Sequence, residues 1–363
     1  MSRPAWIHSR AVDCAFILAP AFLVSLLPWF FPASWLDAKD LNPWTWVGLV
    51  LLIDVAHVYG TLFRSWFDRE EREALSPVLG LILLVCWAGG GALYSWGPDK
   101  FWRVLAYLAV FHFVRQQFGF MRLYSRREKQ PPAWWRWADG AVIYCATGFP
   151  LLFWHLHADR AFNWFSSGDF FSMSELPNGL RDFLLAAASC ALVAAVLFYL
   201  IREVSVKRID GAWNFPRLTI AFGTLLSWNV GIVLFNSDLV FTMTNVVAHG
   251  IPYMALTWAY SSRKPIELAR GRRAWQYAGI FILVLVTAAY GEEFLWDNFV
   301  WAEHVQVFPK FVESISDPAT LAWLVPLLAL PQSSHYVLDG FIWNLRGRRK
   351  SWRKTLDRAR IEN

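Results

Sequence analysis

The chain has 363 residues, of which 56% are hydrophobic, 17% are charged and 23 are tryptophan. A water-soluble domain could not easily bury so much apolar surface, so the composition excludes an ordinary soluble fold and favours a membrane protein. The formal net charge is +6 at pH 7, but its distribution is that of membrane anchoring and not of nucleic-acid binding, so nucleic acid is not expected as a partner.

Long apolar stretches recur along the whole chain. Spanning the hydrocarbon core of a bilayer takes about 20 mostly apolar residues, and ten such stretches are separated by short polar segments. We therefore predict an all-α, polytopic transmembrane bundle of about ten helices, forming a single domain over residues 1–345 that is followed by a basic tail over 346–363. In chain order, the predicted spans are 11–31, 44–67, 76–96, 101–121, 137–154, 180–201, 215–235, 240–260, 275–295 and 319–343.

Basic residues are unevenly divided between the polar segments. With the amino terminus in the cytoplasm, the segments on that side hold 28 of the 34 Lys and Arg residues. Positive residues concentrate on the cytoplasmic side of membrane proteins. We therefore predict both termini in the cytoplasm and a cell-membrane location, with a bacterial inner membrane as the expected setting. The tail over 346–363 is expected either to contact anionic lipid or simply to flank the last span.

Four of the eight histidines fall inside predicted spans, on the second, fourth, eighth and tenth helices. In the predicted topology all four helices run from outside to inside. At about 1.5 Å per residue, the four histidines lie roughly 10–20 Å from the inner boundary of the membrane. One layer of the cytoplasmic half could therefore hold all of them, namely His57, His112, His249 and His335.

Each of these histidines has a polar residue three or four positions away, which is on the same helical face. Polar groups are costly in lipid without partners, so the repeated arrangement indicates that the four faces meet. Imidazoles and carboxylates are ligands of iron, zinc and manganese, and amides could orient the imidazole rings from behind. The partners are Asp54, Gln116, Asn245 and Asp339.

Other interpretations of these residues remain open. A histidine inside a membrane can be a hydrogen-bonded packing residue, or it can relay protons together with Asp54 and Asp339, which are also the evident acid and base groups. Arg115 could bind an anionic or carbonyl group near the site, or it could extend to the lipid headgroups. Pro252 and Pro331 lie close to two of the histidines, so both of those helices are predicted to kink there.

Several familiar enzyme motifs are absent, including a phosphate-binding glycine loop, GxSxG, HExxH and HxxHH. A redox-capable metal in an oily cavity suits oxygen activation on a hydrophobic substrate. We therefore predict a metal-dependent membrane oxygenase or oxidoreductase, with iron as the metal and zinc or manganese as alternatives, acting on a lipid or isoprenoid. A transporter or proton-coupled carrier, and a structural or assembly protein, are the competing classes. The sequence does not define the oligomeric state.

Three short segments carry a resemblance to a known family. They are 56–60 (AHVYG), 111–113 (FHF) and 334–339 (SHYVLD). These segments resemble helix motifs of the Brp/Blh family of membrane beta-carotene dioxygenases. The resemblance implies an all-helical membrane protein whose histidines bind an iron that cleaves beta-carotene with oxygen to give retinal. By match, His57, His112 and His335 would be iron ligands, with His249 as the candidate for the fourth.

Overall fold

The computed structural model describes residues 6–38, 40–129, 131–157, 159–263 and 273–343, and all regular structure within these ranges is helical. The predicted all-α fold is therefore confirmed for this part of the chain. The basic tail expected over 346–363 lies outside the described residues. The α-helices are α1 (Arg10–Val12), α2 (Ala19–Leu26), α3 (Ala33–Leu36), α4 (Pro43–Trp46), α5 (Ala56–Val58), α6 (Arg69–Trp96), α7 (Pro98–Tyr124), α8 (Ala133–Leu156), α9 (Asn178–Asp210), α10 (Phe215–Asn229), α11 (Asp238–Ser261), α12 (Ala274–Trp296), α13 (Pro318–Leu328) and α14 (Leu330–Ile342).

Within the described ranges, seven helical runs are long and apolar enough to cross a membrane, which indicates a multi-pass membrane protein. The other three predicted spans are also helical, as α7, α8 and the pair α13 and α14, but they do not meet the same criterion. Ten crossings and two cytoplasmic termini therefore stay predictions. The seven runs are Arg10–Phe30, Pro43–Phe63, Arg69–Trp96, Asn178–Asp210, Phe215–Leu234, Asp238–Ser261 and Ala274–Trp301.

The last predicted span is broken in two. Helix α13 ends at Leu328 and α14 begins at Leu330, with Pro331 in the first turn of α14. Proline is tolerated in a first turn because its missing N–H has no helical acceptor there. The predicted bend near Pro331 is therefore present as a break, whereas α11 continues as one helix through Pro252.

The helices divide into two compact units. The first unit comprises Met1–Asp40 and Val110–Pro252, and the second comprises Leu41–Ala109 and Tyr253–Asn363. Two of the three boundaries fall inside helices, in α7 and in α11, whereas the boundary between Asp40 and Leu41 lies between α3 and α4. The single domain expected from the sequence stays a prediction.

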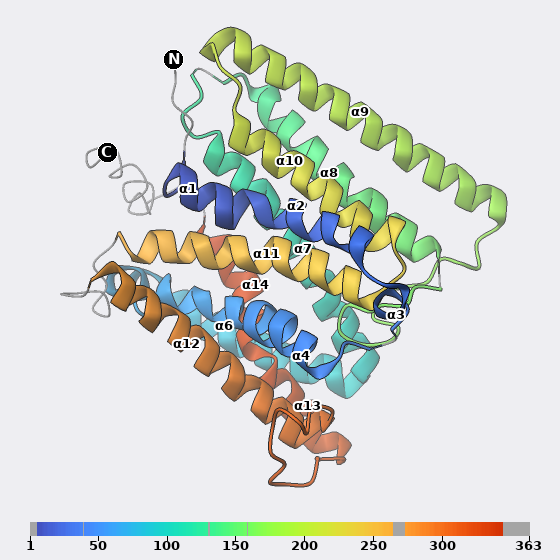
Figure 1. Cartoon of the computed structure of the whole chain (residues 1–363). Coiled ribbons are helices and arrows are strands. Elements are labelled where there is room, and N and C mark those ends of the chain that lie inside the picture. The colour runs from blue at the N-terminus through green and yellow to red at the C-terminus, as the bar shows by residue number, and fades with distance from the viewer. Residues whose placement is uncertain (1–5, 39, 130, 158, 264–272, 344–363) are drawn as a thin grey trace. The chain divides into compact units, whose positions relative to one another are not determined.

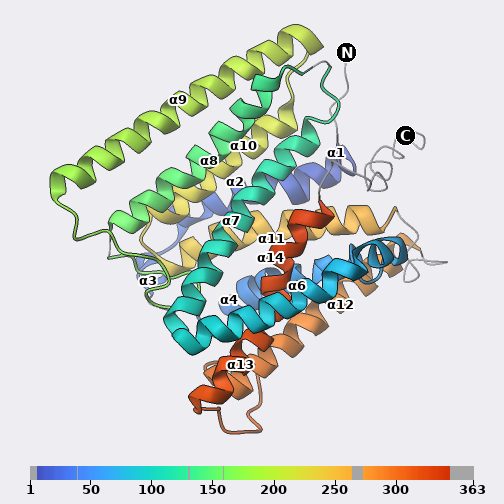
Figure 2. The same ribbon diagram turned by 180° about the vertical axis from the view of Figure 1, so that it is seen from behind.

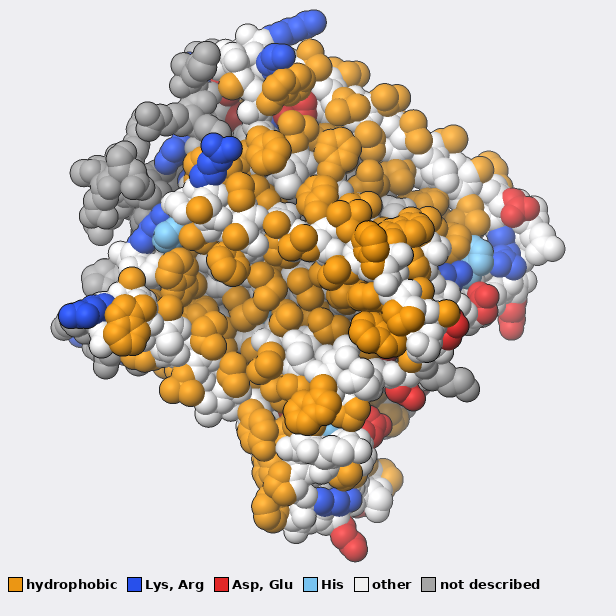
Figure 3. Space-filling view, in the orientation of Figure 1, with side chains coloured by type: hydrophobic (Ala, Val, Ile, Leu, Met, Phe, Trp, Pro, Cys, Tyr) orange, Lys and Arg blue, Asp and Glu red, His pale blue; other side chains and the backbone are white. Residues whose placement is uncertain are grey.

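In the first unit, α8 packs against α9 and α10, and α10 packs against α2 (Figure 1). Helix α9 exposes large apolar side chains such as Phe183, Leu197 and Ile201. Hydrophobic side chains also cover most of the surface visible in Figure 3. Such a surface is unfavourable in water but is well solvated by lipid tails. The exposed apolar face of α9 therefore agrees with a location in the membrane.

In the second unit, α6 packs against both α13 and α14 (Figure 2). The contact between α6 and α13 is close because it is made by glycines. A Cβ atom added to Gly90 would lie 2.8 Å from Pro326, and one added to Gly91 would lie 2.7 Å from Trp323. Trp87 reinforces the contact by donating its indole N–H to the Trp323 carbonyl oxygen at 3.1 Å. Small residues let membrane helices approach in this way.

Three of the basic residues assigned to the cytoplasmic side are fully buried, namely Arg64, Arg202 and Arg217. Arg64 pairs with Glu71 at 2.9 Å, and Arg202 pairs with Asp139 at 2.9 Å. A buried guanidinium needs such a partner, because an unpaired charge in a low-dielectric interior is strongly destabilising. These arginines therefore hold helices together inside the fold and do not contact lipid headgroups.

Candidate metal centre

The four histidines that the sequence places in predicted spans are all buried. Their exposed fractions are 1% for His57, 4% for His112, 1% for His249 and 1% for His335. They come from four separate helices, α5, α7, α11 and α14. An imidazole excluded from water to this extent requires hydrogen-bond partners or a metal ion, because an unsatisfied buried polar group is costly.

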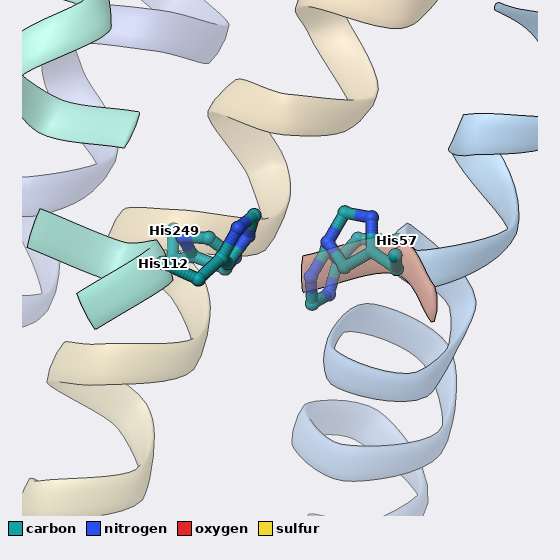
Figure 4. A group of neighbouring side chains, drawn as sticks. His57, His112 and His249 are labelled. Carbon is teal, nitrogen blue, oxygen red and sulfur yellow. The ribbon is translucent and has the colours of Figure 1, made fainter. Parts of the chain in front are cut away.

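In the first unit, His112 and His249 lie next to each other (Figure 4). Their ring centroids are 5.0 Å apart and their planes are inclined by 79°. Phe113 stacks on the His249 ring, with 3.6 Å between the centroids and 8° between the planes. The phenyl ring therefore fixes the orientation of the His249 imidazole and covers one of its faces.

Two glutamines of α7 bind the backbone of α11. Gln116 Nε2 donates to the His249 carbonyl oxygen at 3.0 Å, and Gln117 Nε2 donates to the Ala248 carbonyl oxygen at 3.3 Å. Pro252 has no backbone N–H, so the Ala248 carbonyl, four residues earlier, lacks its usual helical donor. Gln117 supplies that donor. The two amides thus tie together the helices that carry the two histidines of this unit.

In the second unit, His57 and His335 form a similar pair. Their ring centroids are 5.2 Å apart and their planes are inclined by 75°. The ring of Tyr253, which is 1% exposed, lies 5.7 Å from the His57 ring and 4.9 Å from the His335 ring, in edge-on contact with both. Tyr253 therefore packs directly against both histidines of the pair.

The protonation of the His57 ring follows from its neighbour on the same helix. His57 Nδ1 lies 3.3 Å from the Ile53 carbonyl oxygen. Because a carbonyl oxygen only accepts hydrogen bonds, Nδ1 is the protonated nitrogen in this contact and Nε2 keeps the lone pair that a metal would need. The helix is π-helical over Val47–Val55, before His57, and 3₁₀ over Tyr59–Phe63, after it. Irregular turns of this kind are frequent at functional sites.

Two carboxylates lie beside the histidines of the second unit. Asp54 Oδ1 is 3.8 Å from His57 Nδ1, and Asp339 Oδ1 is 3.7 Å from His335 Nδ1. These distances are too long for direct hydrogen bonds, but they place each carboxylate beside the Nδ1 edge of its imidazole. The sequence spacing correctly places each carboxylate on the face of its histidine.

Two hydroxyl groups at this pair are not singled out by the sequence interpretation. Thr61 Oγ1 lies 2.7 Å from His335 Nδ1 and 2.9 Å from the Tyr253 hydroxyl. The Tyr253 hydroxyl in turn donates to Asp339 Oδ1 at 2.7 Å. A signal for both residues exists, since each stands four residues after a histidine of the group. It is missed when only charged and amide side chains are considered as partners.

Three other predicted site residues make contacts away from the imidazole rings. Gln116 bonds to the backbone of α11, and Asn245 Nδ2 donates at 2.9 Å to a carbonyl oxygen one turn earlier on its own helix. Arg115 is exposed and donates to the Tyr144 hydroxyl at 3.1 Å. Catalytic and ring-orienting roles for these residues stay predictions.

Among the described residues, His112 and His249 of the first unit and His57 and His335 of the second form a set of buried histidines that could hold a metal ion. Imidazole nitrogens suit iron, zinc, copper and nickel. The group contains no cysteine, whereas structural zinc sites generally include cysteine thiolates.

No protein-family model matches the chain, and no curated protein or solved structure is significantly similar to it. The class of the protein is therefore defined by its own residues. In the part of the chain that the structure describes, it is all-helical, with seven helices suited to crossing a membrane and four buried histidines that could hold a metal ion. The resemblance of three short segments to the Brp/Blh family stays a prediction.

Proposed function

We propose that this protein is an integral membrane oxygenase or oxidoreductase that uses an iron ion held by His57, His112, His249 and His335. The observation that carries the proposal is the burial of two pairs of imidazoles, one pair in each unit, in a protein with helices suited to crossing a membrane. The substrate is a lipid or isoprenoid, because such molecules, like oxygen, partition into the bilayer around the site.

The choice of metal rests on the donor chemistry. Zinc has no redox chemistry, and manganese prefers oxygen ligands to imidazole. Iron accepts imidazole nitrogen and, when bound, supplies one-electron and oxygen chemistry that side chains lack. The chain's own contribution is to hold the imidazoles at fixed orientations, through Phe113 on His249 and Tyr253 beside the second pair, and to exclude water.

The charge of the site supports a divalent ion. Four neutral imidazoles would leave the two positive charges of a bound divalent ion uncompensated, which is unfavourable in a low-dielectric interior. The carboxylates of Asp54 and Asp339, 3.8 Å and 3.7 Å from the nearest imidazole nitrogens, offset those charges without displacing a ligand. The same two carboxylates are the groups that we assign to proton transfer during the reaction.

Expression in cells that accumulate beta-carotene tests the reaction and the substrate implied by the Brp/Blh resemblance. Wild-type protein is expected to bleach the cells, and an alanine in place of any of the four histidines is expected to abolish bleaching. His155→Ala is the matched control, because the His155 ring bonds to its own helix at Leu151, outside the group. Persistent colour with well-expressed wild type would exclude carotene as substrate.

A separate measurement tests the oxygenase assignment without assuming carotene. Iron-loaded protein in lipid nanodiscs is supplied with membrane isoprenoids, and oxygen uptake is recorded with an electrode. We expect substrate-dependent uptake in wild type and in His155→Ala, and none in His112→Ala. Uptake that does not differ between wild type and His112→Ala would reject a reaction at this site.

One observation favours the competing carrier function. Thr61, Tyr253 and Asp339 form a continuous hydrogen-bonded chain, which is an arrangement suited to moving protons. A proton-coupled carrier would dissipate an imposed pH gradient across proteoliposomes, would do so after treatment with a metal chelator, and would stop in Asp339→Asn. An enzyme of the kind proposed would leave the gradient intact.

A further inference from the structure

The hydroxyl of Thr61 joins a histidine of the metal group to a tyrosine. Its Oγ1 lies 2.7 Å from His335 Nδ1 and 2.9 Å from the Tyr253 hydroxyl oxygen. Thr61 is 5% exposed, and Tyr253 and His335 are each 1% exposed, so bulk water does not compete for these contacts. The chain of contacts continues to Asp339, whose Oδ1 accepts from the Tyr253 hydroxyl at 2.7 Å.

Counting hydrogens along this chain assigns a direction to every bond. Asp339, as a carboxylate, can only accept, and the indole N–H of Trp343 also donates to its Oδ1 at 3.2 Å. The single hydroxyl hydrogen of Tyr253 is therefore used toward Asp339. Tyr253 must then accept from Thr61, which uses the only hydroxyl hydrogen of Thr61.

These bond directions determine which nitrogen of the His335 imidazole is protonated. Since Thr61 has no second hydrogen to donate, it can only accept from His335 Nδ1, which must then carry a proton. A neutral imidazole with a proton on Nδ1 has its lone pair on Nε2. The direct route from His335 to Asp339 is closed, because 3.7 Å between Nδ1 and Oδ1 is too long for a hydrogen bond.

We propose that Tyr253 and Thr61 are positioning residues that relay the Asp339 carboxylate to His335, so that His335 is held as the Nδ1–H tautomer and offers Nε2 as a metal ligand. The relay lengthens, by two hydroxyl groups, the carboxylate–histidine–metal arrangement that raises the basicity of a histidine ligand. The inference rests on the proposed function for its metal, but the tautomer itself is a property of the metal-free protein.

The tautomer is measured first, in the absence of metal. Nitrogen-15 NMR of histidine-labelled, metal-free protein in nanodiscs distinguishes protonated from unprotonated ring nitrogens. The His335 signals are identified by their loss in His335→Gln. We expect a protonated Nδ1 and an unprotonated Nε2 in wild type, and a mixture of the two tautomers in Tyr253→Phe. A protonated Nε2 in wild type would overturn the proposal.

Metal affinity is measured second, with Co²⁺ as the probe because its visible bands report the ligand environment. Tyr253→Phe and Thr61→Val each remove one hydroxyl with little change in shape. Each is expected to weaken Co²⁺ binding about 10–100-fold and to shift the bands. Because both act through one chain, the double variant is expected to lose no more than the weaker-binding single variant.

Tyr260→Phe is the matched control. Tyr260 lies on the same helix, is also fully buried, and donates an equivalent hydrogen bond to a carboxylate, that of Asp68, at 2.7 Å. It is expected to keep the wild-type Co²⁺ affinity and bands even if it lowers thermal stability.

The outcomes separate the relay from the metal site. Wild-type affinity and bands in Tyr253→Phe, or fully additive losses in the double variant, would overturn the relay. If wild type itself binds no Co²⁺, the proposed function fails, while the NMR result still decides whether Tyr253 and Thr61 set the His335 tautomer.

Discussion

The side-chain amide of Gln117 donates a hydrogen bond to the carbonyl oxygen of Ala248, at 3.3 Å. That oxygen is the one that Pro252 leaves without its helical donor, since proline has no N–H to offer four residues later. Gln117 thereby satisfies a carbonyl group of α11 that belongs to the residue directly before His249. The polar residue on α7 and the proline on α11 are therefore two parts of one structural feature.

Replacing Gln117 by Leu is expected to destabilise the protein by about 1–3 kcal/mol, because the buried Ala248 carbonyl then has no donor. The measurement is the free energy of unfolding in mixed micelles titrated with sodium dodecyl sulfate. In a Pro252→Ala background the helix regains its own donor, so the same substitution is expected to cost less. Equal costs in the two backgrounds would show that Gln117 does not act through Ala248.

The close contact between α6 and α13 makes a second prediction. Gly91→Ala is expected to destabilise the protein by about 1–3 kcal/mol, because the added methyl group overlaps the Trp323 ring and neither helix can move without loss of packing. Gly89→Ala is the control, since a Cβ atom there meets nothing within 4 Å. The prediction is wrong if thermal unfolding in detergent shows the same Tm for both variants.

A third prediction concerns His304, in the loop after α12, whose ring stacks on Trp46 with 3.7 Å between centroids. Burial lowers the pKa of His304 below its ordinary 6.5, although the nearby carboxylates of Asp297 and Glu303 act in the opposite direction. The folded state therefore favours the neutral ring. The stability that this contributes is complete above pH 6.5 and is lost as the pH falls below 6.5 toward the folded pKa.

The test compares the Tm of wild type with that of His304→Gln, which keeps a polar side chain but cannot be protonated. The wild-type Tm is expected to fall more steeply than that of the variant as the pH is lowered from 6.5. Parallel Tm curves over the acidic range would mean that His304 is not held in its neutral form.

The helices and the four histidines can be predicted from the sequence because both have local signals. Apolar runs of sufficient length identify membrane helices, and a spacing of three or four residues places Asp54 beside His57 and Asp339 beside His335. Periodicity shows which residues share a face of one helix, however, and not which other helix packs against that face. The hydrogen bond from Gln117 to Ala248 therefore could not be predicted from the sequence.

The contacts of Arg115, Thr61 and Tyr253 also depend on which helices pack together. Arg115 shares a helix with His112, but the structure directs its side chain to Tyr144. Thr61 and Tyr253 carry no charge and resemble ordinary packing residues in the sequence, yet their hydroxyl groups join His335 to Asp339. Their role depends on which helices meet, and that is decided by tertiary packing.

Elemental analysis of the purified protein tests the central claim most directly. Protein produced with iron in the medium and purified in detergent is expected to contain about one metal ion per chain. That ion should be lost in His57→Ala, His112→Ala, His249→Ala and His335→Ala, and kept in His155→Ala, with all variants eluting as folded protein from a sizing column. Metal-free wild type, or metal retained in all four variants, would contradict the account.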